Sequence, residues 1–362
     1  MHRNNFTGAR GPGSHNRMRS RCAAFASILL WTLCAQSEAQ PDPAGQQTAA
    51  LSRNPTAEKV IIDTDIGMDI DDAFALVLAL DSPELEILGF TTASGDTLAR
   101  AKIIDRMLGE SGHANIPVAV GVPTDPPSKA WPAGIIGLQK RYGDGGRYAK
   151  ASHPQAVDFI LETIRQYPGQ ITLVTIGPLS NVGAMIDKDV ATFRKVKRVV
   201  MMGGQVGPVD DITGRTYVST PEYNIRLDIK SAQKLFRSGV PIYVMPLDST
   251  NTLALDEVKR ERVFASATPL TDSLALLYLL WNNTTPILYD AMAVTFLVKP
   301  DLCPVEPMYL VVDDTGVTRP EHGPANAQVC LRSDSNKFLS YFMQRVTGEA
   351  EASGSLASNG PQ

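Results

Sequence analysis

The stretch Val60–Leu80, VIIDTDIGMDIDDAFALVLAL, decides the fold. It begins inside Lys59–Asp63, a short run of β-forming residues, and ends in Asp71–Leu80, which has the apolar spacing of a buried helix. Five carboxylates, from Asp63 to Asp72, lie at the junction between the two. A strand that passes directly into a helix through a polar turn is typical of a βαβ unit.

The same alternation continues along the chain. Apolar runs predict further strands, and stretches with helical spacing separate several of them. The strands are expected at Leu85–Thr92, Ile116–Val120, Ile171–Ile176, Arg198–Met202 and Pro241–Pro246, and the helices at Leu98–Gly109, Pro154–Tyr167 and Ser231–Gly239. This order predicts a single Rossmann-like α/β domain over residues 58–347, with a mainly parallel central sheet flanked by helices.

The two ends of the chain are expected to lie outside that domain. Residues 1–39 have a basic start, the short apolar run Cys22–Cys34 and small residues before Ala39, which together predict a cleaved signal peptide. The apolar run is too short for a stable membrane anchor, so we expect an exported protein, either periplasmic or secreted. Residues 40–57 have the composition of a linker, and residues 348–362 that of a disordered tail.

Bulk composition favours a small-molecule ligand. The formal charge of −4 argues against nucleic acid, which usually requires clustered Lys and Arg. Beyond the predicted signal peptide two cysteines remain, Cys303 and Cys330, whose separation fits no zinc pattern. A disulfide between them and a pair of buried free thiols are equally open.

The acidic cluster is the main candidate for a site. Carboxylates this close repel one another, and the helix dipole at Asp71 offsets only part of the repulsion. A divalent cation would relieve it, and ligands that are all oxygen favour calcium or magnesium over zinc. The alternative is structural: Asp69 or Asp71 caps the helix, and the rest of the loop is solvated.

The cluster also carries a family resemblance. The run IIDTDIGMDIDDAFALVLAL resembles the N-terminal signature of the inosine-uridine-preferring nucleoside hydrolases. Later stretches resemble other blocks of that family in the same order, and the similarity covers about residues 58–345. These stretches are TTASGD (Thr91–Asp96), TLVTIGPLSNV (Thr172–Val182), VVMMGG (Val199–Gly204), PEYNIRLD (Pro221–Asp228) and YDAMAV (Tyr289–Val294).

The resemblance implies an enzyme that hydrolyses the N-glycosidic bond of ribonucleosides to ribose and free base, using a Ca²⁺ ion. Asp65 would bind the ion and take a proton from its water, and the other ion ligands would be Asp72, Asp290 and the backbone carbonyl of Ile176. The ribose would be held by Asp71, Asp96, Glu222, Asn224 and Asp290. The family also suggests a homodimer or homotetramer.

The sequence departs from the family pattern at three places. Two extra residues, Asp69 and Ile70, precede the Asp71–Asp72 pair. Asp96 stands where an asparagine is usual, and Tyr289 stands where many members have a histidine proposed to protonate the leaving base. Tyr289 is therefore the candidate acid here, although a phenol matches neutral pH less well than imidazole does.

Two other functions fit parts of the sequence. Asp63-Thr64-Asp65 after a strand resembles the nucleophile motif of haloacid-dehalogenase-type phosphatases, although Ile66-Gly67-Met68 does not suit that family. An exported nucleoside-binding protein with the same fold but no turnover is the non-enzymatic alternative. The preference for purine or pyrimidine bases is not encoded in any readable motif.

Overall fold

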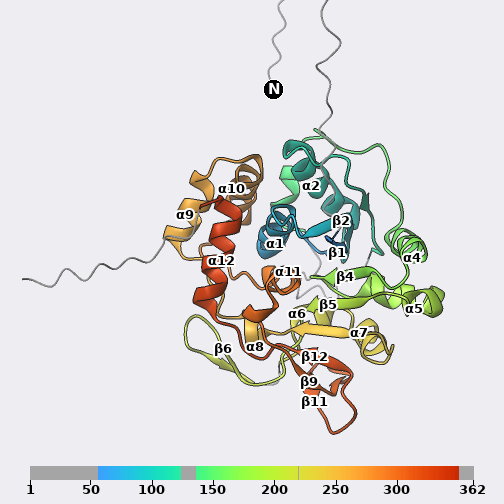
Figure 1. Ribbon diagram of the computed structural model, residues 1–362. Coiled ribbons are helices and arrows are strands. Elements are labelled where there is room, and N and C mark those ends of the chain that lie inside the picture. The colour runs from blue at the N-terminus through green and yellow to red at the C-terminus, as the bar shows by residue number, and fades with distance from the viewer. Residues whose placement is uncertain (1–55, 124–135, 219, 350–362) are drawn as a thin grey trace, which may run out of the picture. The chain divides into compact units, whose positions relative to one another are not determined.

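The acidic stretch leaves the end of a central strand. The computed structural model describes residues 56–123, 136–218 and 220–349. In this part of the chain, eight strands form one sheet with the order β3-β2-β1-β4-β5-β8-β12-β9 (Figure 1). The strands are β1 (Glu58–Thr64), β2 (Leu85–Thr92), β3 (Val118–Ala119), β4 (Ile171–Thr175), β5 (Arg198–Met202), β8 (Ile242–Met245), β9 (Glu306–Met308) and β12 (Ala327–Val329). Every neighbouring pair is parallel except β12 with β9, which confirms the predicted mainly parallel sheet.

Helices cover both faces of the sheet, as the alternation predicts. In β1, Val60 and Ile62 face one apolar cluster and Ile61 faces the other, because successive side chains of a strand point to opposite sides. The first cluster contains residues of α1 (Asp71–Leu80), α2 (Thr97–Glu110), α10 (Pro269–Trp281), α11 (Ala291–Val298) and α12 (Ser335–Thr347). The second contains residues of α4 (Ala156–Gln166), α5 (Ser180–Phe193) and α7 (Ile229–Phe236) (Figure 1).

The strand order reverses beside β1. From β1 the chain runs outward through β2 to β3, and it then returns to pair β4 with the opposite edge of β1. In parallel sheets such a switch point opens a crevice beyond the carboxyl ends of the strands. The carboxyl ends of β1 and β4 are Thr64 and Thr175, so the acidic loop and the segment at Ile176 begin beside this crevice.

Several elements were not expected from the sequence. They include the two-stranded sheets β6 (Val209–Asp210) with β7 (Thr216–Tyr217) and β10 (Leu310–Val312) with β11 (Thr318–Pro320), and also the strands β9 and β12 of the main sheet. The unexpected helices include the short α3 (Lys140–Gly143), α6 (Tyr223–Leu227), α8 (Leu247–Thr250) and η1 (Pro300–Leu302), and the longer α5, α9 (Glu257–Ala265), α10, α11 and α12. These strands are two or three residues long, too short for alternation to reveal them.

A disulfide joins Cys303 to Cys330, with Cα atoms 5.5 Å apart. This decides the choice that the sequence left open, and the bond ties the end of η1 to the residue after β12. Both cysteines are fully buried.

The predictions for the two ends of the chain fall mostly outside the described residues. The predicted signal peptide (1–39) lies wholly outside them, as do most of the linker (40–57) and of the tail (348–362). Within the described ranges, no helix has both the length and the apolar character needed to cross a membrane.

Candidate active site

The crevice at the switch point contains a cavity of about 260 Å³. Its walls come from the loops after β1, β4, β5 and β8, together with the starts of α1, α6 and α11. The described residues that line it are Asp65, Met68, Asp69, Asp71, Asp72, Ile176, Met202, Glu222, Tyr223, Asn224, Leu247, Tyr289 and Asp290. The cavity is polar where the carboxylates gather, and two tyrosines, two methionines, an isoleucine, a leucine and an asparagine form the rest of its wall.

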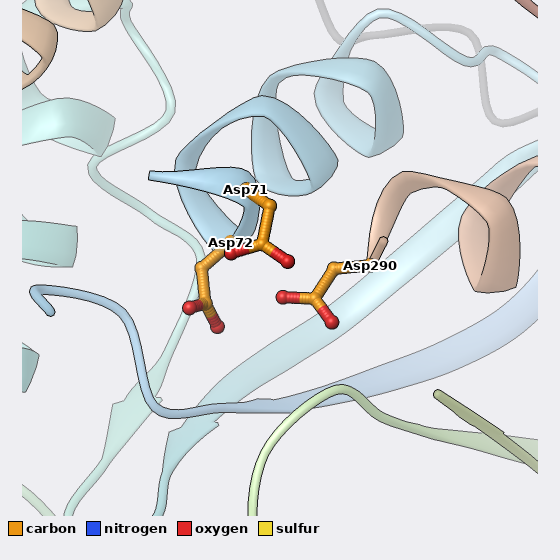
Figure 2. A group of neighbouring side chains, drawn as sticks. All are labelled: Asp71, Asp72 and Asp290. Atoms are coloured by element: carbon orange, nitrogen blue, oxygen red, sulfur yellow. The ribbon is translucent and has the colours of Figure 1, made fainter. Parts of the chain in front are cut away.

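Three carboxylates converge in this cavity. Asp71 and Asp72 lie in the first turn of α1, and Asp290 is the residue before α11, so two helix N-termini present acidic side chains to one point (Figure 2). Oxygens of Asp71, Asp72 and Asp290 all lie within 4.8 Å of one another, and all three residues are buried. Burial raises the pKa of each carboxyl well above its usual value, and the charges of the neighbouring aspartates raise it further.

These donors suit a hard cation. Each ligand atom in the trio is an oxygen, and the negative charge is held in place by hydrogen bonds such as that from Thr64 Oγ1 to Asp72 Oδ1, at 2.5 Å. The structural alternative, that this loop is a solvated helix cap, conflicts with the burial of Asp71 and Asp72, which are 5% and 3% exposed.

Asp65 lies beside the trio and lines the same cavity. It is 6% exposed, and burial raises the pKa of its carboxyl to about 6 although the nearby positive charge of Arg100 opposes the rise. Gly177 permits its placement: a Cβ on that glycine would lie 2.9 Å from Asp65 Oδ1, too close for any side chain. The sequence Ile176-Gly177 therefore brings the turn after β4 against the carboxylate that follows β1.

Asp63 stands behind this group, at the end of β1. Its Oδ1 accepts hydrogen bonds from Thr91 Oγ1 at 2.5 Å and Asn181 Nδ2 at 2.8 Å, whereas Oδ2 is buried with no partner among the described residues. Burial raises the pKa of this carboxyl to about 6. It does not line the cavity.

The Glu222–Asn224 pair forms another wall. Glu222 caps α6: its carboxylate accepts the backbone N–H groups of Gly204, Asn224 and Ile225 at 3.0 to 3.1 Å. The Asn224 amide donates to the Met202 carbonyl at 3.2 Å and the Ile176 carbonyl at 3.5 Å. These bonds fix both side chains, so they present a rigid polar surface to the cavity.

Tyr289 lines the cavity next to Asp290. Burial raises the pKa of its phenol, and the charges of Asp71 and Asp69 raise it further, so the hydroxyl keeps its proton at neutral pH. The group can therefore donate a hydrogen bond into the cavity, and it is a weaker acid than an exposed tyrosine.

Asp96 is the one sequence-predicted site residue outside this set. Its carboxylate caps α2 by accepting the Ala99 N–H at 3.0 Å, and its other oxygen lies 3.5 Å from Lys140 Nζ. The side chain is 50% exposed and does not line the cavity. The structure thus gives Asp96 a capping role, and its part in binding ribose stays a prediction from the family resemblance.

Several of the lining residues have no role that the sequence predicts. Met68, Met202, Tyr223 and Leu247 form much of the apolar wall, and Tyr223 Oη approaches the Met68 sulfur at 3.4 Å. Tyr223 lies between Glu222 and Asn224 in the sequence, and this position could have indicated that it also lines the site.

Comparison with known proteins agrees with this geometry. The family model described as inosine-uridine preferring nucleoside hydrolase matches residues 60–340. The chain belongs to this family. A nucleoside hydrolase cleaves N-glycosidic bonds, so the protein is an enzyme, and membership replaces the phosphatase interpretation of Asp63-Thr64-Asp65.

Three relatives show the extent of the likeness. An uncharacterized protein of Schizosaccharomyces pombe is 37% identical over 203 residues, which are 54% of this chain and 63% of that protein. The pyrimidine-specific ribonucleoside hydrolase RihB of Escherichia coli is 30% identical over 80% of this nucleoside hydrolase and 97% of its own length. A solved purine-preferring ribonucleoside hydrolase of Gardnerella vaginalis is 26% identical, with a TM-score of 0.66 over 80% of this chain and 98% of that one.

Proposed function

We propose that this nucleoside hydrolase converts ribonucleosides to ribose and free base, with Asp65 as the general base and a calcium ion in the acidic cavity. The observation that carries the proposal is the convergence of Asp71, Asp72 and Asp290 within 4.8 Å, in a cavity that Asp65 also lines. Asp65, Asp72, Asp290 and the Ile176 carbonyl would hold the ion. When bound, such an ion acidifies a water molecule and anchors sugar hydroxyls.

The chain's own residues then perform the reaction. Asp65 accepts a proton from the attacking water at a carboxylate oxygen, a role open to a buried carboxylate that lines the cavity beside the other aspartates. Cleavage passes through an oxocarbenium-like state, so the surrounding carboxylates stabilise the positive charge that develops on the ribose. Asp71, Asp290, Glu222 and Asn224 hold the ribose hydroxyls, and Tyr289 donates a hydrogen bond to the departing base.

A substrate panel tests the proposal. Free ribose should be released from uridine, cytidine, inosine or adenosine, with no phosphate released from p-nitrophenyl phosphate. Dialysis against a chelator should remove the activity, and added calcium should restore it. Full activity after chelation would refute the role of the ion, and tight nucleoside binding without base release would favour the non-enzymatic alternative.

The raised carboxyl pKa values predict how pH affects the metal-free protein. The folded chain holds protons on these groups more tightly than the unfolded chain, so its free energy of unfolding should fall as pH rises from about 4 to about 6. Asp63 alone, raised from 3.8 to about 6, contributes about 3 kcal/mol to this fall. Metal-free protein should therefore melt at least ~5 °C higher at pH 5 than at pH 7.5.

Two comparisons sharpen this melting experiment. Calcium should remove most of the pH dependence, because the ion holds the carboxylates in their charged form. Asp63→Asn should reduce the pH dependence of the melting temperature by the contribution of the one carboxyl group that it removes. Glu58 and Asp189, whose carboxyl pKa values are lowered, lose their stabilising effect only at lower pH. A metal-free protein that melts lower at pH 5 would contradict the expected sign.

We also propose that the enzyme is exported and assembles as a homodimer or homotetramer. Export is supported by the N-terminal sequence and by the Cys303–Cys330 disulfide, a bond that persists mainly in oxidising compartments. The assembly is proposed from the family resemblance alone. Sequencing the N-terminus of protein recovered from the periplasm or medium tests export, and analytical ultracentrifugation tests the assembly.

A further inference from the structure

The loop that leaves β1 is held by its backbone carbonyls. Arg100 Nη1 donates to the carbonyl of Asp65 and, at 2.8 Å, to that of Ile66. Gly137 N–H donates to the Gly67 carbonyl at 2.8 Å. Gln139 Nε2 donates to the carbonyls of Met68 and Asp69 at 3.2 and 2.7 Å. Every carbonyl from Asp65 to Asp69 is therefore bonded to a donor from α2 or from the segment before α3.

The two side chains that provide most of these bonds are fully buried. Arg100 and Gln139 are both 0% exposed, and neither lines the cavity. Arg100 also bonds through Nε to the Ser94 carbonyl at 2.8 Å, so one guanidinium bridges the loops after β1 and β2. A buried charge is costly unless its donors are satisfied, and here backbone carbonyls satisfy them.

The segment before α3 also fits the loop closely. Gly67 has a φ of +119°, and a Cβ there would lie 2.7 Å from Ile136 Cγ1. Segment 136–139 thus packs directly on the turn that separates Asp65 from Asp71. The loop is fixed from two sides, by α2 and by this segment.

We propose that Arg100 and Gln139 are positioning residues that hold the loop in the shape that gathers Asp65, Asp71 and Asp72 around the cation. The inference rests on the proposed function. Without these bonds, mutual repulsion would move the carboxylates apart, and binding the cation would then require the loop to be ordered again. Residues that orient metal ligands in this way typically change metal affinity or activity by about 10- to 100-fold when they are replaced.

Gln139→Leu is the first test. Leucine has a side chain of similar size but cannot donate the two hydrogen bonds to the Met68 and Asp69 carbonyls. The change also removes Gln139 Oε1, which is buried with no partner among the described residues. We expect calcium affinity, measured by isothermal titration calorimetry, to fall by about 10-fold or more. Activity on p-nitrophenyl riboside at saturating calcium should fall as well.

Gln233→Leu is the matched control. Gln233 is 8% exposed on α7, its Nε2 donates to the Val312 carbonyl at 3.1 Å and to Asp314 Oδ1 at 3.0 Å, and it does not line the cavity. Its loss should lower stability to a similar extent but leave calcium affinity within about 2-fold of wild type. Arg100→Lys, which keeps the charge but not the planar fork, should weaken calcium as Gln139→Leu does.

The outcomes separate the inference from the proposed function. If wild-type protein binds no calcium or releases no ribose, the proposed function fails. If wild type binds calcium and both glutamine variants match it, or both lose affinity in proportion to their loss of stability, the positioning role is overturned. A loss of calcium affinity in Gln139→Leu and Arg100→Lys, but not in Gln233→Leu, supports the positioning role. If Arg100→Lys does not fold, the comparison of Gln139→Leu with Gln233→Leu still tests that role.

Discussion

Replacing Asp65 by asparagine should lower kcat by about 10²–10⁴-fold on every nucleoside substrate, the range typical for loss of a general base. Asparagine keeps the shape of the side chain but cannot accept a proton from water. Because the base acts on the water and not on the leaving group, p-nitrophenyl riboside should lose as much activity as inosine or uridine. Steady-state kinetics at saturating calcium measures this, since the variant should also bind the ion less tightly.

Asp81→Asn is the control for this variant. Asp81 lies at the far end of α1, and burial also raises the pKa of its carboxyl to about 6, but it does not line the cavity. Its replacement should leave kcat within about 2-fold of wild type. If Asp65→Asn also retains nearly full activity at saturating calcium, Asp65 is not the base.

The central part of the fold could be predicted because its patterns are long. β1, α1 and β2 appear in the sequence as apolar runs with clear breaks, and parallel strands buried on both faces need just such runs. The family resemblance predicts that Asp65 and Ile176 share one site, and both follow strand ends, beyond which ligands bind in parallel sheets. The structure brings both to the same cavity.

The remainder depends on contacts between distant parts of the chain. Arg100 and Gln139 lie 35 and 70 residues from the loop carbonyls they bind, Asp65 and Asp69, and no local motif marks either of them. Asp96 shows the opposite ambiguity: it occupies a family position, but a residue before a helix can also cap that helix, and Asp96 does so here. The disulfide was open for the same reason, since sequence spacing does not determine pairing.

We propose that the apolar wall of the cavity determines which nucleobase the enzyme prefers. Met68, Tyr223, Leu247 and Tyr289 line the cavity together with the acidic trio, so we expect the nucleobase to lie against these side chains. The relatives do not settle the choice, because one is named pyrimidine-specific and another purine-preferring. The relative kcat/KM values in the substrate panel therefore report on these four side chains.

Tyr289→Phe should separate the leaving group from the rest of the chemistry. If the phenol donates to the departing base, its loss should lower kcat for inosine by about 10²-fold, the lower end for general acid catalysis. The lower end applies because burial beside Asp71 and Asp69 raises the pKa of this phenol and weakens it as an acid. The departing group of p-nitrophenyl riboside needs no proton, so that substrate should lose only a few-fold.

The comparison of the two substrates also tests the structural role of Tyr289. The residue adjoins Asp290, so a loss of packing there would disturb the acidic trio and slow both reactions to the same extent. Calcium affinity measured on the same variant distinguishes the acid role of Tyr289 from its structural role. If the hydroxyl acts only on the departing base, calcium affinity should be unchanged, because phenylalanine keeps the ring that packs beside Asp290. Equal losses on both substrates, with weaker calcium binding, would show that Tyr289 only orients Asp290 and that another group, or stacking, activates the departing base.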